Sequence, residues 1–274
     1  MLGMTEDADA GWKRELALPV HDCFADLIAR LSAKRFPGCA ELNALLDERH
    51  RSGSGVPIRF VSAGEGALRD EPYEARIFRW GEVITREQNW HDLFNALAWL
   101  AFPATKRELN AIHGEQLSLD PTGEGRRGTT RDVLTLFDES GLLVACADAS
   151  LAALLTGFQW KELFWTRRED VERHMRFFVF GHALHEHALK PYPGITGKAL
   201  IVDVDEGFLQ APPSGQRTAI DGHAAQWLRA RSLTSTRLLA PLPMLGIPGW
   251  DADNAHAPYY DNTDVFRPGR RLST

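Results

Sequence analysis

Hydrophobic residues recur with helical spacing in several separate segments of the chain. Phe24, Leu27, Ile28 and Leu31 occupy positions i, i+3, i+4 and i+7, which predicts an amphipathic helix that ends near Pro37. The same spacing and start signals predict further helices at about 42–46, 90–101, 105–113, 148–158 and 221–233. In the helix at 90–101 nearly every position is apolar, Asn89 is a favourable N-cap residue, and Pro103 ends it.

Short alternating or β-branched runs predict a few strands. The runs at 57–61, 73–77 and 198–204 each read as a strand, and Gly81 could turn the second run into another strand that continues through Ile84. Residues 132–147 are expected to form a hairpin with its turn at Asp138–Gly141. Between 166 and 190 two interpretations stay open, a continuous helix or a buried strand at Phe177–Phe180, because periodicity does not separate them.

The order of these elements predicts an α+β fold. We expect a single mixed domain at 19–274, mostly helices packed on a small antiparallel or mixed sheet, preceded by a poorly ordered segment at 1–18. The last forty residues hold many prolines and are expected to wrap around the domain as an ordered tail. No internal repeat or linker divides the chain.

Composition excludes several classes of protein. Apolar residues make up 44% of the 274 residues and charged residues 25%, which is typical of a globular protein and not of a disordered one. A net charge of −6 argues against a nucleic-acid partner, since phosphate binding needs a clustered positive field. No run of about 20 apolar residues predicts a membrane span. Oligomeric state is left open.

Cysteine usage and the first residues favour a cytoplasmic protein. The three cysteines, Cys23, Cys39 and Cys146, show no C-x-x-C spacing, which speaks against a disulfide framework and a cysteine-based zinc site. Residues 1–11 are acidic and lack the apolar core of a signal peptide.

Two motifs match familiar signatures only by letter. Gly123–Gly128 spells G-x-G-x-x-G, but no predicted strand precedes it and no helix follows it, so a dinucleotide site is not expected. His185-Glu186 begins like H-E-x-x-H, but Leu189 replaces the second histidine of that zinc motif.

The apolar helix at 90–101 carries the most suggestive polar residues. His91, Asp92 and Asn95 lie within one turn of a segment that is otherwise suited to burial, and buried polar groups need partners. A histidine beside a carboxylate can move a proton, so His91 and Asp92 are candidate catalytic residues that Asn95 would orient. In the structural alternative Asp92 stabilises the helix N-terminus and His91 is a satisfied core histidine.

Three further groups are candidates. His182 and Glu186 have i, i+4 spacing if their segment is helical, which suits an acid/base or two-ligand pair, and we count them as catalytic. Lys106, Asn110 and His113 form a polar stripe that is either a solvated face or a binding surface on which Lys106 holds an anionic group. Asp138, at the tip of the expected hairpin, is a further candidate for substrate binding.

Several motifs in a fixed order resemble a known bacterial family, domain-of-unknown-function family 3025. They span about Pro19 to Pro268 and comprise Trp90–Leu97 with Phe102-Pro103, Thr105-Lys106, Leu109-Asn110, His113, Thr135–Gly141, Trp160–Trp165, Phe180–Leu184, Pro241–Trp250, Tyr260-Asp261 and Val265–Pro268. The resemblance implies a single soluble domain. The family has no assigned activity, so it lends no catalytic residue.

The leading hypothesis is a hydrolase-like enzyme acting on a polar small molecule. His91 and Asp92 would transfer protons, and His182 with Glu186 would approach from a second helix, with or without one divalent metal ion. One alternative is an HNH-like metal-dependent nuclease, because a hairpin and a helix with His, Asn and His are expected. The other is a non-enzymatic binding or regulatory protein in which the polar cluster is structural. An open pocket at these residues would favour catalysis.

Overall fold

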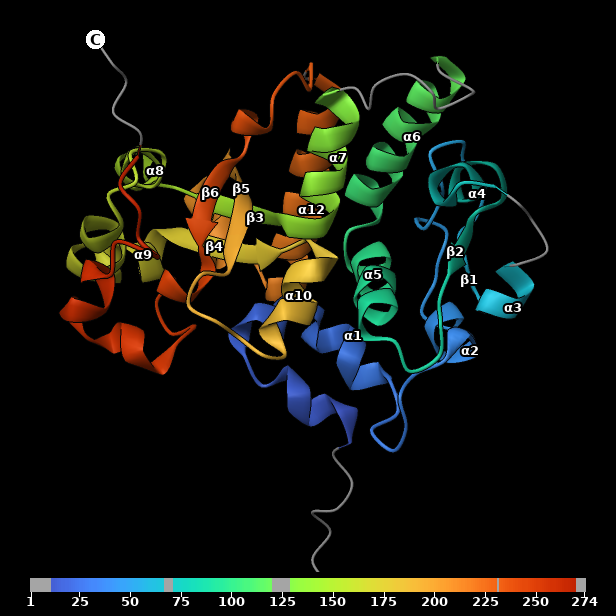
Figure 1. The fold of residues 1–274 in the computed structure, drawn as a ribbon, viewed down its shortest axis with the longest axis horizontal. Coiled ribbons are helices and arrows are strands. Elements are labelled where there is room, and N and C mark those ends of the chain that lie inside the picture. Colours follow the sequence, from blue (N-terminus) through green and yellow to red (C-terminus); the bar gives the residue numbers. More distant parts are fainter. Residues whose placement is uncertain (1–10, 67–70, 120–128, 231, 270–274) are drawn as a thin grey trace, which may run out of the picture.

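Helices surround a four-stranded sheet in the computed structural model, which describes residues 11–66, 71–119, 129–230 and 232–269 (Figure 1). The predicted α+β class is confirmed. The α-helices are α1 (Ala25–Arg30), α2 (Cys39–Asn43), α3 (Ala63–Gly66), α4 (Tyr73–Trp80), α5 (Trp90–Ala101), α6 (Pro103–Leu119), α7 (Thr129–Ser140), α8 (Ala149–Thr156), α9 (Arg168–His174), α10 (His182–Ala188), α11 (Glu206–Gln210) and α12 (Pro213–Ala230). Short 3-10 helices span Trp12–Leu16, Pro19–Phe24, Thr236–Leu238, Met244–Gly246, Ala252–Ala255 and Ala257–Asp261, and a π-helical turn spans Glu162–Thr166.

The main sheet has the strand order β4-β3-β5-β6. Its strands are β3 (Gly141–Cys146), β4 (Met175–Val179), β5 (Thr196–Asp203) and β6 (Ala240–Pro243). The two central strands β3 and β5 run parallel, and each edge strand is antiparallel to its neighbour. A separate parallel pair joins β1 (Arg59–Val61) to β2 (Glu82–Ile84).

Strand β3 is buried on both faces, so its side chains alternate between two hydrophobic cores. Leu143 and Ala145 belong to the core that α5, α7 and α12 form. Leu142 and Val144 belong to a second core. α8, the π-helical turn and the segment from Leu242 to Phe266 complete this second core, which places the C-terminal part of the chain against the sheet.

Helix α5 has the predicted bounds and is buried from Asp92 to Ala101. Its N-cap is Asn89, whose side chain accepts a hydrogen bond from the Asp92 amide at 2.9 Å. A helix buried on all sides has no solvent to satisfy its polar side chains. The buried polar side chains Asp92 and Asn95 therefore need hydrogen-bond partners from other parts of the chain.

Helix α6 begins at Pro103 and is capped by a residue from α12. The carboxylate of Asp221 accepts hydrogen bonds from the amides of Ala104 (2.9 Å) and Thr105 (2.8 Å), and the Thr105 hydroxyl donates to the Asp221 carbonyl. Burial raises the pKa of Asp221, and these hydrogen bonds oppose the shift. The N-terminus of α6 is thereby fixed by tertiary structure and not by a local capping residue.

The strand predicted at 73–77 is wrong, since these residues begin helix α4. Ala75, Arg76 and Ile77 are consecutively buried, whereas a half-buried strand would alternate. Five residues are too few for sequence periodicity to decide. Gly81 ends the helix in the left-handed conformation (φ 68°), so only 82–84 form a strand.

The hairpin predicted at 132–147 is also wrong. Residues 129–140 form α7, whose Val133, Leu134 and Phe137 are buried at helical spacing, and Gly141 begins β3. Glycine is needed there because a Cβ would lie 2.4 Å from the Phe137 carbonyl oxygen. Asp138 therefore lies on a helix and not on a hairpin tip, and the HNH-like interpretation loses the hairpin on which it depended.

The open segment at 166–190 contains both proposed elements. Helix α9, strand β4 and helix α10 follow one another, so the strand interpretation of 177–180 is correct in substance. The alternative of one continuous helix from 166 to 190 is wrong, since Val171, Phe178 and His182 belong to three different elements.

Some predictions concern the ends and gaps of the described chain. The Gly123–Gly128 motif and residues 1–10 of the N-terminal segment predicted to be poorly ordered lie outside the described residues. Within that segment, Trp12–Leu16 forms a 3-10 helix with Trp12 buried. Helix α6 extends past His113 to Leu119, into a region predicted as loop. Among the helices of the described ranges, none has the length and apolar character to cross a membrane.

We expect Asp221→Ala to lower the free energy of unfolding by about 2–3 kcal/mol, because two amides of α6 would lose a buried charged acceptor. Denaturant titration measures this loss. As a control, Arg229→Ala removes only the exposed ion pair to Glu108 between the same helices and should cost at most about 1 kcal/mol. Equal effects of the two changes would contradict the capping role.

Candidate functional site

Helix α10 packs directly against α5 (Figure 1). His91 of α5 contacts two side chains of α10. Its Nδ1 atom is 2.9 Å from the Glu186 Oε2 atom, and its Nε2 atom is 3.1 Å from the His182 Nε2 atom. The side chains of His91 and Glu186 are 34% and 42% exposed, whereas that of His182 is 8% exposed. The two predicted pairs thus meet, with His91 at the water-accessible end.

The hydrogen-bond pattern assigns the protons of this pair. An ionised Glu186 requires a proton on Nδ1 of His91, which leaves Nε2 of His91 as an acceptor for the Nε2–H of His182. Nδ1 of His182 then carries no proton. It is buried without a hydrogen-bond partner, 3.7 Å from the Asp138 Oδ2 atom. One added proton would give both Nδ1 atoms an N–H group directed at a carboxylate.

The two imidazoles differ in their surroundings. Burial lowers the pKa of His182 to about 4, although the Asp138 carboxylate opposes the shift. The side chain of His91 is 34% exposed and contacts Glu186 directly. His91 is therefore the ring of the pair that water reaches more readily.

A buried ion pair supports His182 from behind. The ammonium of Lys106 is 2.7 Å from the Asp138 Oδ1 atom and donates to the Asn95 Oδ1 atom at 2.9 Å. It also lies 5.3 Å from the centre of the Trp99 ring. Burial alone would raise the pKa of Asp138, but Lys106 and His182 outweigh it, and the pKa is lowered.

The remaining α5 residues have partners other than those predicted. Asp92 accepts hydrogen bonds from the backbone and guanidinium of Arg86 at 2.8–2.9 Å and makes none to His91. Burial opposes this ionised state, yet Arg86 lowers the pKa of Asp92. Asn95 donates to the Tyr73 hydroxyl oxygen at 2.6 Å and so connects Tyr73 to Lys106. Asp92 and Asn95 therefore position other groups.

The polar stripe on α6 is buried and not solvated. Asn110 donates to the Glu74 carbonyl oxygen and carboxylate at 3.1 and 3.0 Å, and it accepts a hydrogen bond from the Gly53 amide. His113 is 9% exposed, and within the described residues it has no hydrogen-bond partner. The three residues thus differ in role, since Lys106 and Asn110 hold neighbouring carboxylates while His113 is left available.

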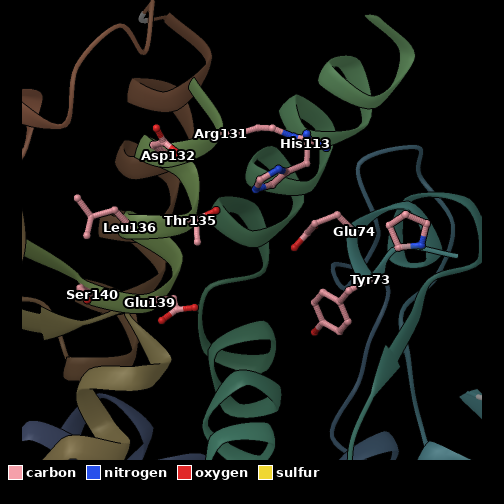
Figure 2. Close-up of a pocket in the computed structure, with 10 residues that line it drawn as sticks. Tyr73, Glu74, His113, Arg131, Asp132, Thr135, Leu136, Glu139 and Ser140 are labelled. Atoms are coloured by element: carbon pink, nitrogen blue, oxygen red, sulfur yellow. The ribbon is translucent and has the colours of Figure 1, made fainter. Parts of the chain in front are cut away.

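Two adjoining cavities open beside the histidine pair. The inner one, about 310 Å³, reaches His91, Asp92, Asn95, Asp138 and His182. The outer one, about 560 Å³, lies between α4 and α7, the two helices that flank α6 (Figure 2). They have five lining residues in common, which are Tyr73, Glu74, His113, Thr135 and Glu139. A small molecule could therefore occupy both and touch His91.

Sequence reasoning did not identify several of the cavity residues, among them Tyr73, Glu74 and Arg86. The first two lay in a segment predicted as strand, which hid their place on a helix. Arg86 lies in the short segment before α5, where its charge carried no distinctive signal. Partners from distant segments are visible only once the fold is known.

In the described part of the chain, no set of three or more His, Cys, Asp or Glu side chains is arranged to hold a metal ion. The Nε2 atoms of His91 and His182 lie 3.1 Å apart and provide at most a pair of ligands. The geometry therefore suits proton transfer more directly than metal coordination.

We expect Lys106→Met to destabilise the protein by about 3–5 kcal/mol, because it leaves the Asp138 carboxylate buried without its cation. The double variant Lys106→Met/Asp138→Leu should recover most of that loss, as measured by denaturant unfolding. A double variant less stable than Lys106→Met would contradict the assignment of the pair.

The comparisons with known proteins extend over nearly all of these elements. A family model described as protein of unknown function (DUF3025) matches residues 58–270, which include every histidine and carboxylate of the cluster around His91. No curated protein and no solved structure matches the chain. The family resemblance of the sequence motifs is confirmed, and because the match covers most of its length, the chain belongs to the DUF3025 family.

Proposed function

We propose that the protein is a hydrolase-like enzyme that acts on a polar small molecule by acid/base catalysis in the cleft formed by the two cavities. One observation carries the proposal, namely the His91 ring held between the Glu186 carboxylate and His182 at the wall of an open cavity. A histidine so oriented, with one nitrogen fixed by a carboxylate, is suited to general-base catalysis.

In the proposed reaction His91 activates a water molecule. Nε2 of His91 exchanges the hydrogen bond from His182 for one from the water. It takes the water's proton as the water oxygen attacks the electrophilic centre of the substrate, and the same proton is later given to the leaving group. Glu186 holds the tautomer and stabilises the imidazolium. His182, with Asp138 facing its other nitrogen, restores the 3.1 Å contact once the proton has left. Atoms balance because water is added across the bond that breaks.

Tyr73 is the proposed donor to the developing negative charge. Burial of its hydroxyl raises its pKa well above the ordinary value, so it stays a neutral phenol. Since its oxygen accepts from Asn95, its O–H can donate into the cavity. A fixed neutral donor directed at an oxyanion is a major source of transition-state stabilisation.

In an alternative mechanism, a divalent metal ion takes the place of the proton between His91 and His182. Each imidazole presents Nε2 to the same point while its Nδ1 faces a carboxylate, an arrangement that also supports histidine ligands of metals. Since no third ligand is arranged nearby in the described chain, we favour the proton.

The setting of the proposed enzyme is a reducing cytoplasm, in keeping with free thiols at Cys23, Cys39 and Cys146. Nucleic acid is not the proposed substrate, because carboxylates outnumber cationic side chains around both cavities.

We expect the purified protein to hydrolyse at least one of three chromogenic substrates, p-nitrophenyl acetate, alanine p-nitroanilide or p-nitrophenyl phosphate. His91→Gln should reduce kcat/KM by about 10²–10⁴-fold, and Glu186→Gln should have a smaller effect. His187→Gln, at an exposed position next to Glu186, is the matched control and should change little. No hydrolysis of any of the three, or equal rates in the wild type and His91→Gln, would refute the proposal.

Zinc distinguishes the two versions of the mechanism. If the pair shares a proton, EDTA should leave the rate unchanged, and added Zn²⁺ should inhibit by occupying the two Nε2 atoms. Inhibition should be lost in His182→Gln. Loss of activity in EDTA with recovery on adding Zn²⁺ would support the metal version instead.

A further inference from the structure

Carboxylates dominate the outer cavity once internal ion pairs are set aside. In the inner cavity Asp92 is neutralised by Arg86 and Asp138 by Lys106. Among the described residues, the outer lining then holds Glu74, Asp132 and Glu139 against one cationic side chain, Arg131. The cavity next to the proposed base therefore carries excess negative charge and favours a cationic ligand.

His113 supplies an observation independent of this charge. It is more than nine-tenths buried, it lines both cavities, and no side chain or backbone group of the described chain hydrogen-bonds its ring. Its ring nitrogens are not fully enclosed by protein, so a ligand in the cavity can hydrogen-bond to them. In Figure 2 the ring points into the cavity between α4 and α7.

Two carboxylates reach the same space from opposite walls. Figure 2 shows Glu74 extending from α4 and Glu139 from α7 toward the middle of the cavity. Glu74 is held in place by Asn110, which donates a hydrogen bond to its Oε2 atom, and its Oε1 atom has no hydrogen-bond partner among the described residues. This carboxylate is therefore preorganised, which lowers the entropic cost of binding a donor.

We propose that the outer cavity binds a primary ammonium group. The substrate is then an amine-bearing small molecule whose reacting end lies at His91. The statement about the substrate rests on the proposed function.

The numbers of donors and acceptors agree with this ligand. An ammonium group has three N–H donors and no acceptor, and the cavity offers three partners, the carboxylates of Glu74 and Glu139 and a ring nitrogen of His113. The half-exposed ring of Tyr73 adds an aromatic surface on the same wall. A bare metal ion fits less well, because these groups are not arranged as ligands of one ion.

A matched set of four-carbon probes tests the inference. n-Butylamine, 1-butanol and butyrate differ only in the charge and hydrogen bonding of one end. Each is titrated at pH 7 into the full chain while the ring signals of His113 are followed by NMR. We expect saturable shifts with butylamine, and affinities at least about tenfold weaker for the alcohol and the anion.

Variants connect the binding to the named carboxylates. Glu139→Gln, at an exposed position, and Glu74→Gln/Glu139→Gln should each weaken butylamine binding, the double variant by about tenfold or more. The single variant keeps the test valid if loss of the Asn110 contact unfolds the double one. Glu169→Gln, on exposed α9, is the control and should bind as the wild type does.

The two proposals can fail separately. Equal binding of butanol, tighter binding of butyrate, unaltered binding in both variants, or no saturable shift up to about 50 mM butylamine would overturn the ammonium site. His91→Gln should still bind butylamine although it lacks hydrolytic activity. Amine binding without any hydrolysis would refute the enzyme and leave an amine-binding protein.

Discussion

The buried ammonium of Lys106 is the constraint from which the arrangement of the site follows. A charge removed from water needs a counter-charge and further acceptors, and these come from α7 through Asp138 and from α5 through Asn95. Satisfying one lysine thereby connects three helices. The Asp138 carboxylate also faces His182. Lys106 therefore sets the electrostatic environment of the histidine pair through Asp138, although Lys106 itself does not reach the cleft surface.

Burial of helix α5 has the complementary effect. Because its apolar side chains fill the core, its few polar groups lie at fixed positions and accept only partners of matching geometry. Arg86, Glu186 and Lys106 each meet one of them. The groups proposed for catalysis therefore lie on elements that cannot shift without disturbing the core, which provides the preorganisation that catalysis requires.

Helix α5 was predictable from the sequence because cap, periodicity and Pro103 all agreed, and its polar residues were correctly expected to need partners. Which partners they have was not predictable. His91 pairs with Glu186, 95 positions away, and not with adjacent Asp92, because neighbours on a helix point in different directions.

The hairpin prediction for 132–147 was wrong for a local reason. Asp-Glu-Ser-Gly has good turn chemistry, but it ends a helix here, and the burial of Val133, Leu134 and Phe137 decided the outcome. Likewise, the polar stripe of α6 reads as solvated until α4 and α7 are placed beside it.

The capping of α6 by Asp221 has a consequence for motion. Lys106, Asn110 and His113 all lie on α6, whose first turn is secured by a carboxylate more than one hundred positions later in the chain. Any fluctuation that detaches α12 would release the start of α6 and displace Lys106, Asn110 and His113 at the same time. Hydrogen-exchange protection at the amides of Ala104 and Thr105 would then report on the integrity of the cleft, and the two helices would open as one cooperative unit.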